Sequence, residues 1–195
     1  MIADLIRKNR SCRRFDEKYA VALHTLKELV ELARLSASGA NLQPLRYVLC
    51  CDRASNAEIF SCLGWAGYLK DWLGPAPGEQ PAAYIIMLAD MDVSQDAGCD
   101  HGIAAQSILL GARDKELAGC MIGSVNRKKL KNILDIPDRF QILLVLAIGK
   151  PVETAVIETV GSDGSVYYWR DADGVHHVPK RKLEDIVIAQ YGPQH

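Results

Sequence analysis

The sequence has no long hydrophobic run, no strong excess of either charge and no glycine-rich phosphate loop. No stretch of about 18 or more apolar residues occurs, so we expect no membrane-spanning helix. Lysine and arginine number 23 against 24 aspartate and glutamate residues, which leaves a formal net charge of −1. This balance gives no general attraction to nucleic acid or to an anionic membrane. Motifs of the Gly-x-Gly-x-x-Gly or Walker type are absent, so we expect no dinucleotide bound in the Rossmann manner.

The start of the chain and its cysteines indicate a reducing compartment. Asp4 stands where a signal peptide would carry basic residues, and no apolar core region follows it. The six cysteines are scattered, several of them inside apolar runs, and a chain of 195 residues can form a core without disulfides. We therefore expect a cytoplasmic protein. The adjacent Cys50 and Cys51 are interpreted as strand packing; the alternative is a vicinal redox pair, although no basic neighbour would lower a thiol pKa.

Hydrophobic residues make up 49% of the chain, which fits a single globular domain over residues 1–195. Short apolar runs predict buried strands, and helical spacing of apolar residues predicts helices between them; the strands are expected near 47–51, 82–89, 119–123 and 143–148, and the helices near 2–9, 24–36, 57–63, 99–117 and 126–134. Taken alone, such alternation favours a parallel α/β sheet covered on both faces. Turn signals at Asp163-Gly164 and Asp173-Gly174 predict an antiparallel hairpin extension at about 154–178.

Three polar clusters are candidate binding segments, although each alone fits a solvated turn or loop better. Arg10, Ser11 and Arg13 follow the first helix, and arginine guanidinium groups bind phosphate bidentately. The side chains of Ser38, Asn41 and Gln43 carry hydrogen-bonding groups that would suit the polar edge of a planar ring ligand. Lys180 and Arg181 form the third cluster, in a basic triplet after a proline.

Two further segments have alternative interpretations. Trp65, Tyr68 and Trp72 lie in an irregular stretch rich in proline and glycine, which favours a pocket wall and a surface loop pinned by its aromatic residues about equally. Cys99-Asp100-His101 brings three potential metal ligands together. Adjacent residues rarely converge on one ion, so we expect no metal site and interpret Asp100 as the start of a helix.

Taken in order, the clusters resemble the nitroreductase family. Arg10-Ser11-x-Arg13-x-Phe15 and Ser38-x-x-Asn41-x-Gln43-Pro44 are similar to its two N-terminal signatures, and 102–110 resembles its central helix. Further similarities lie at 119–123, 134–137, 147–151 and 179–187, so the resemblance covers almost the whole chain. Asn9 departs from the pattern, because a second arginine is usual there.

The resemblance implies an α+β fold in three α/β/α layers, with a central, mostly antiparallel sheet flanked by helices. It therefore overrides the parallel arrangement that the apolar strands favour. It also implies an FMN cofactor, bound by the residues that match the family's cofactor-binding motifs: Arg10, Ser11, Arg13, Ser38, Asn41, Gln43, Cys120, Ile122, Gly123, Lys180 and Arg181. In the family, the loop matching Ser38 to Gln43 often reaches the flavin of the other subunit, so a homodimer with FMN at the interface is implied.

The function implied by the resemblance is that of a flavoprotein oxidoreductase. NAD(P)H would reduce FMN, and the flavin would reduce a nitroaromatic, quinone or similar electrophilic acceptor by a ping-pong mechanism. The flavin carries the chemistry, so no catalytic side chain is expected, and Trp65, Tyr68 and Trp72 are the candidates for the substrate pocket. The alternatives are a flavin-binding or sensor protein without turnover, and a related flavin chemistry such as reductive dehalogenation.

Overall fold

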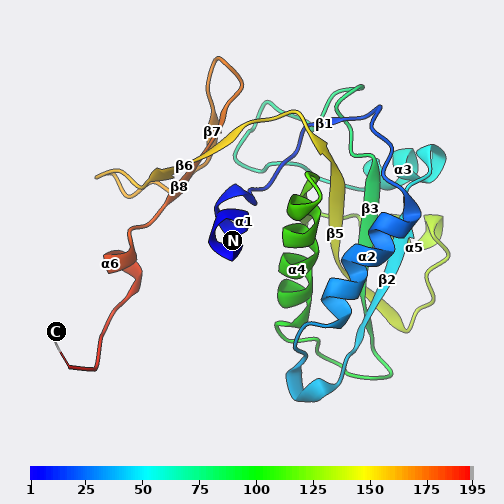
Figure 1. The fold of residues 1–195 in the computed structure, drawn as a ribbon. Helices are drawn as coiled ribbons and strands as arrows, with labels where there is room; N and C mark the ends of the chain where they lie inside the picture. Colours follow the sequence, from blue (N-terminus) through cyan, green and yellow to red (C-terminus); the bar gives the residue numbers. More distant parts are fainter. Residues whose placement is uncertain (194–195) are drawn as a thin grey trace. The chain divides into compact units, whose positions relative to one another are not determined.

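The computed structural model describes residues 1–193, and the chain divides into two compact units, Met1–Val152 and Glu153 onward, each described by itself. Figure 1 draws the first unit and labels most of its elements. In chain order these elements are α1 (Ile2–Lys8), β1 (Phe15–Asp16), α2 (Leu23–Arg34), a 3-10 turn (Gly39–Asn41), β2 (Leu45–Cys50), α3 (Arg53–Phe60), β3 (Ala83–Asp90), α4 (Asp100–Asp114), β4 (Ala118–Ile122), α5 (Arg127–Ile133) and β5 (Phe140–Pro151). Within residues 1–193, none of the helices combines the length and hydrophobicity that crossing a bilayer requires.

The first unit is organised around an antiparallel sheet in the order β1-β5-β3-β2, with β4 also paired to β5. One edge of the long strand β5 pairs with β3. Its other edge pairs first with β4 and then, at Lys150 and Pro151, with β1. Strands β4 and β1 therefore follow one another along the same edge of β5, and the chain segment before β1 runs beside the start of β4.

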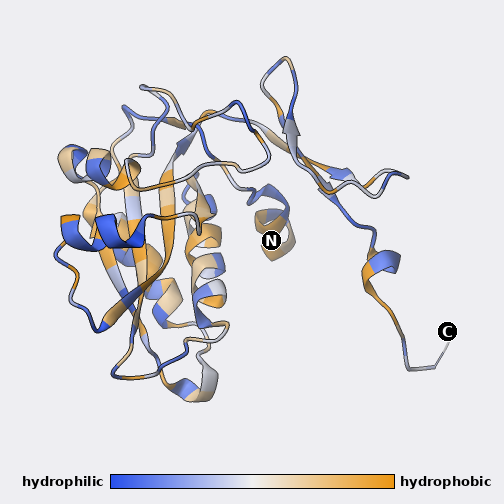
Figure 2. Cartoon of the chain, turned by 180° about the vertical axis from the view of Figure 1, so that it is seen from behind, coloured by the Kyte–Doolittle hydropathy of each residue, from blue (hydrophilic) through white to orange (hydrophobic). Residues whose placement is uncertain are grey.

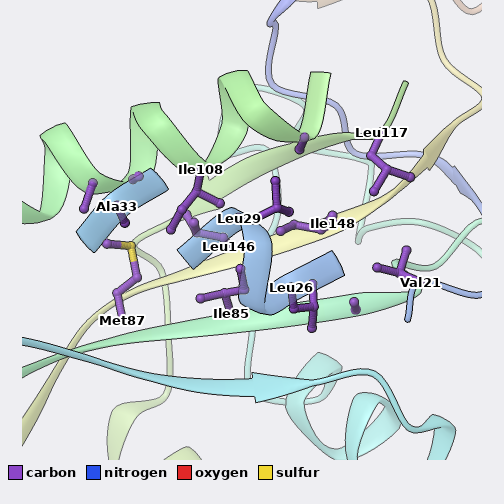
Figure 3. Close-up of a cluster of buried hydrophobic side chains, with 14 residues drawn as sticks. Val21, Leu26, Leu29, Ala33, Ile85, Met87, Ile108, Leu117, Leu146 and Ile148 are labelled. Atoms are coloured by element: carbon purple, nitrogen blue, oxygen red, sulfur yellow. The ribbon is translucent and has the colours of Figure 1, made fainter. Parts of the chain in front are cut away.

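Strand β3 is buried along its whole length because helices cover both faces of the sheet. Ile85 and Met87 point to the face covered by α2 and α4, in the cluster drawn in Figure 3. Ile86 and Leu88 point to the opposite face, where they pack with Ile59 of α3 and with residues of α5. Figure 2 shows the same arrangement as hydrophobic colouring concentrated on the central strands. The three-layer α/β/α fold implied by the resemblance is thus confirmed.

The parallel arrangement favoured by the apolar strands alone is wrong, since every strand pair in this sheet is antiparallel. A continuous apolar strand reports burial on two faces, and two helical layers bury an antiparallel strand as completely as a parallel one. The predicted helices and long strands are all present within a few residues of their expected bounds. The two-residue strand β1 was not predicted, because it is too short to carry a periodic signal.

The second unit contains β6 (Ala155–Thr159), β7 (Trp169–Arg170), β8 (His176–Lys180) and α6 (Leu183–Ile186). Asp173-Gly174 forms the predicted hairpin turn, with Gly174 at a φ of 79°, and β7 pairs antiparallel with β8. Strand β6 instead pairs with β8 in parallel, which corrects the fully antiparallel extension expected at 154–178. Two parallel strands need a connection that returns the chain to the end of the sheet where the first strand began, and residues 160–175 between β6 and β8 are long enough to do so.

His177 links the strands of the second unit electrostatically. Its Nδ1 is hydrogen-bonded to the carboxylate of Glu158, and its Nε2 is hydrogen-bonded to Asp171 Oδ2 at 3.1 Å. Its ring stacks on the ring of Trp169, with 3.8 Å between the two centroids. The hydrogen bonds to Asp171 and Glu158 raise the pKa of His177 above 6.5. The hydrogen bond from His177, with one from the Val175 amide, lowers the pKa of Asp171 below 3.8.

We predict that the second unit is most stable between the lowered pKa of Asp171 and the raised pKa of His177. The contribution of His177 is fully present below pH 6.5 and is lost as the pH rises through the raised folded-state pKa; that of Asp171 is lost as the pH falls through its lowered one. Replacing His177 with glutamine should therefore lower the amide protection of β8 at pH 6 more than at pH 9. Hydrogen exchange measures this, with His24→Gln on α2 as the control. An equal loss of protection at both pH values would contradict the prediction.

Candidate functional site

The predicted phosphate-binding segment is fixed between β4 and β1 by its backbone. The Cys12 amide donates to the Gly119 carbonyl at 3.0 Å, and the Val152 amide donates to the Arg14 carbonyl at 3.1 Å. Cys12 and Phe15 are buried in a small cluster with Ala118. Gly119 is required for the close pairing of β4 with β5, because a Cβ there would overlap the Ala147 carbonyl of β5. The side chains of Ser11 and the arginines are consequently displayed from a rigid base.

Arg10 is a partly buried cation of this segment that has no acidic partner within the described residues. Its Nη2 donates to the Ile6 carbonyl at 2.6 Å, at the end of α1. Its Nε is buried and has no hydrogen-bond acceptor within residues 1–193, and no carboxylate in that range forms an ion pair with it. Burial lowers the pKa of the Arg10 guanidinium, although the group stays charged at neutral pH. An anion would supply the missing acceptor.

The neighbouring arginines have different partners. Arg14 forms a bidentate pair with Glu79, with Nε at 2.7 Å from Oε2, so its charge is neutralised within the fold. Arg13 donates from Nη1 to the Ser11 carbonyl at 3.4 Å and remains half-buried, which places its guanidinium close to Ser11. Arg10, Ser11 and Arg13 therefore stay together as candidate anion-binding residues, while Arg14 has a structural role.

The second predicted segment, Ser38 to Gln43, forms a tight turn over the start of α4. Ser38 Oγ donates to Asp100 Oδ2 at 2.6 Å, and the Gly39 amide donates to Asp100 Oδ1 at 2.9 Å. Gln43 Nε2 donates to Asn41 Oδ1 at 3.1 Å, so these two amide side chains are oriented together. Asn41 and Gln43 are exposed. Their polar edges are accessible from solvent.

A cavity of about 370 Å³ lies beside this turn. It is lined by residues of α2, the turn, β2 and the start of α4, among them Ser38, Gln43, Tyr47 and Asp100. Burial, with a smaller contribution from the Asp100 charge, raises the pKa of Tyr47 to about 12, so its hydroxyl is neutral at physiological pH. No local sequence pattern indicates this cavity, because its lining residues come from four separate segments.

At the third predicted segment, the side chains of β4 differ from expectation. Cys120 and Ile122 are 1% and 5% exposed and belong to the core on the α3 and α5 side, so only their backbone can reach a ligand. Gly123 is exposed at the end of the strand. Met121, which the motif did not single out, is 39% exposed between buried neighbours. Alternation along β4 would have identified it, because Met121 must face away from Cys120 and Ile122.

The aromatic segment connects two parts of the candidate site. It begins where the Gly64 amide donates to the Ser124 carbonyl at 2.8 Å, just beyond β4. It ends where Glu79 holds Arg14. Trp65 packs on Phe60 and Trp72, with ring centroids 5.6 and 6.5 Å away, which fits a loop pinned by its aromatic residues. Tyr68 is 51% exposed. The role of all three predicted residues in a substrate pocket stays a prediction.

Lys180 and Arg181 belong to the second unit. Lys180 is the last residue of β8, where its carbonyl accepts the Val160 amide at 2.9 Å, and Arg181 precedes α6. Both side chains are exposed. Their contribution to a phosphate site stays a prediction.

Within the first unit, the two N-terminal motifs lie at opposite ends of α4. Asp100 at the start of the helix holds the Ser38 turn, whereas Arg10 to Arg13 lie beside β4, which begins just after the helix ends (Figure 1). A helix of 15 residues is about 22 Å long. A single chain therefore presents two separate polar surfaces, and its fold alone does not bring both to the same ligand.

The fold and this site define a class: a three-layer α/β/α domain with an antiparallel sheet, carrying a basic segment at the junction of two edge strands. The sequence profile of the nitroreductase family matches residues 6–150, which is well over half of the chain. The chain belongs to the nitroreductase family, whose members are oxidoreductases.

Known relatives agree with this assignment. YodC of Bacillus subtilis (strain 168), named as a candidate NAD(P)H nitroreductase, is 21% identical over 78% of this chain and 90% of its own length. An oxygen-insensitive NADPH nitroreductase of Helicobacter pylori is 36% identical over 28% of this chain and 26% of its own length. The structure of an FMN-dependent nitroreductase from Clostridium difficile R20291 matches with a TM-score of 0.64 at 21% identity, covering 78% of this chain and 88% of that one.

The thiols provide a test of the Cys50-Cys51 interpretation. Burial raises the pKa of Cys50 to about 11, whereas Cys99 is exposed at the start of α4. We predict that Ellman's reagent labels Cys99 rapidly at pH 7.5 and leaves Cys50 unlabelled in the folded protein, because the thiolate is the reactive species. Replacing Cys99 with serine should remove the fast phase. A fast phase that persists and disappears with Cys50→Ser would instead support a redox-active pair.

Proposed function

We propose that this protein is an FMN-dependent oxidoreductase that uses NAD(P)H to reduce nitroaromatic, quinone or similar electrophilic acceptors by a ping-pong mechanism. The single observation that carries the proposal is Arg10, a partly buried guanidinium without an acidic partner in the described chain. It stands on a segment hydrogen-bonded to β4. An anionic phosphate satisfies this geometry, and family membership indicates which phosphate-bearing cofactor to expect.

The residues would divide the task of holding the cofactor. Arg10 and Ser11 would bind the phosphate, and Arg13 would place a positive charge near the flavin pyrimidine. When bound, FMN supplies the two-electron chemistry between NAD(P)H and the acceptor. A cation beside the pyrimidine favours the anionic reduced form, so Arg13 would raise the reduction potential as well as the affinity. No side chain of the protein needs to act as a nucleophile or as a general base.

We further propose a homodimer in which each FMN site takes the arginine segment from one subunit and the Ser38 to Gln43 turn from the other. The separation of these motifs along α4 supports this arrangement. So does the exposed apolar surface of the first unit, where Ile2 of α1 is 62% exposed, Leu35 after α2 is 66% exposed and Leu42 in the turn is 52% exposed. A partner that covered these side chains would remove their apolar surface from water, which favours association.

Cofactor binding tests the role of Arg10 and Arg13. The protein should bind FMN and appear yellow, NADH or NADPH should bleach it anaerobically, and an added quinone or nitroaromatic should restore the colour. Replacing Arg10 and Arg13 together with alanine should weaken FMN binding by about a hundredfold or more, because each would make a charge-assisted hydrogen bond. Fluorescence quenching of FMN measures the affinity. The matched control is Lys128→Ala with Lys131→Ala on α5.

The outcomes separate the enzyme from its alternatives. Bound FMN that neither nicotinamide reduces would favour a flavin-binding or sensor protein without turnover. Reduced flavin that transfers electrons only to halogenated aromatics would favour reductive dehalogenation. Unchanged FMN affinity in the double variant would contradict the assignment of Arg10 and Arg13, and wild-type protein that refuses FMN would overturn the whole proposal.

The second prediction concerns the shared site. One variant carries alanine at Arg10 and Arg13, and the other at Ser38, Asn41 and Gln43; each should be inactive alone. After subunit exchange at equal concentrations, half of the dimers are mixed and each has one intact site, so about a quarter of the wild-type sites should return. NAD(P)H-dependent quinone reduction measures the recovery. A mixture as inactive as its components would contradict a site built from two subunits.

A further inference from the structure

Asp100 is a buried carboxylate at the first residue of α4. Its side chain is among the few buried charged groups of the protein, since the residue is only 5% exposed. Within residues 1–193, no cation forms an ion pair with it. A buried charge without a counter-ion is costly unless hydrogen bonds satisfy it. The hydrogen bonds that the Asp100 carboxylate accepts therefore identify the groups that stabilise its buried charge.

Both oxygens of Asp100 accept hydrogen bonds from the Ser38 turn. Oδ2 accepts from Ser38 Oγ at 2.6 Å and Oδ1 accepts from the Gly39 amide at 2.9 Å. Ser38 Oγ in turn accepts a hydrogen bond from the backbone amide of Gln43 at 2.9 Å. The carboxylate, the hydroxyl and the Gln43 amide form a continuous chain of hydrogen bonds across the turn. Helix α4 is thereby tied to the far end of the turn as well as to its beginning.

The turn needs this support because its backbone is strained. Ala40, Asn41 and Gln43 have φ values of 47°, 56° and 53°, in the left-handed region that non-glycine residues rarely adopt. Such residues persist only where the surrounding structure over-determines them. The main-chain bonds Asn41 N to Ser38 O and Leu42 N to Gly39 O close the turn. Asp100 supplies the contacts that anchor it to a regular element.

An ordinary helix cap does not explain this geometry. A carboxylate in the first turn of a helix is favoured by the helix dipole, and it often accepts the helix's own amides. Here the two carboxylate oxygens accept instead from the Ser38 hydroxyl and the Gly39 amide, 62 and 61 positions earlier in the chain. The carboxylate therefore faces the turn, and the dipole of α4 lowers the free energy of keeping its charge buried there.

We propose that Asp100 is a positioning residue that holds the Ser38 to Gln43 turn in the one conformation in which Asn41 and Gln43 can meet the flavin. The proposal rests on the proposed function for its ligand, and on the hydrogen bonds alone for its structural part. Asp100 does not touch the cofactor; it acts through Ser38 and the backbone. Loss of its charge should release the turn, and FMN should then bind to a loop that must first be ordered.

The test uses the full-length protein and FMN itself. Asp100→Asn should weaken FMN binding about tenfold, because an amide cannot accept hydrogen bonds at both positions and one donor is left unsatisfied. In the FMN-free protein, hydrogen exchange at the Gly39 and Gln43 amides should accelerate, while exchange in β3 and β5 stays at the wild-type rate. Asp138→Asn, an exposed residue paired with Lys131 after α5, makes the same charge change away from the turn.

Two variants at Ser38 separate positioning from general destabilisation. Ser38→Ala should release the Gln43 amide, while the Gly39 amide stays protected by Asp100. Ser38→Thr restores the hydroxyl and should recover most of both protection and affinity. If Asp100→Asn binds FMN as tightly as the wild type, or if exchange accelerates equally in β3 and in the turn, the proposal is overturned. If the wild-type protein binds no FMN while Asp100→Asn still shows faster exchange confined to the turn, the proposed function is overturned and Asp100 is left as the anchor of the turn only.

Discussion

The two-sided burial of β3 is the constraint on which the rest of this structure depends. All eight residues of the strand are buried, so helices must cover both faces of the sheet and polar side chains are confined to its edges and ends. Pairing with β3 occupies one edge of β5 and leaves the other for β4 and β1. The basic segment before β1 is placed at their junction because β5 is long enough to pair with both strands in turn.

Electrostatic pairing then selects among the arginines that this arrangement displays. Arg14 is neutralised by Glu79, Arg34 by Glu31 and Arg46 by the buried Asp90. Arg10 receives no such partner within residues 1–193, although its guanidinium is partly withdrawn from water. Desolvation without an acidic partner makes an external anion favourable at this point. A count of charged residues cannot show this, because the chain as a whole is almost neutral.

The layered fold and most helices and long strands could be predicted from the sequence, because apolar spacing reports burial directly. Strand direction could not, since two-sided burial gives β3 the same pattern in either direction. Motif order selected Arg10, Ser38 and Gly123, of which Gly123 is exposed and the other two are half-buried. It also selected Cys120 and Ile122, whose side chains face the core, and passed over Met121. Asp100 begins α4 as predicted, but its contacts with the Ser38 turn were not predicted, because Ser38 and Gly39 are 62 and 61 residues away in the sequence, a separation over which local patterns carry no information.

The placement of Asp100 is consistent with a site shared between two subunits. A loop that binds a ligand held by its own chain can be ordered by that ligand and by its neighbours together. A loop presented to another subunit binds best when it is already ordered, because a flexible loop loses conformational entropy on association and this loss weakens binding. The strained turn at Ala40 to Gln43 is held by a charge on a long helix of the same subunit. That internal anchoring lets Asn41 and Gln43 face outward in a fixed geometry without relying on the ligand.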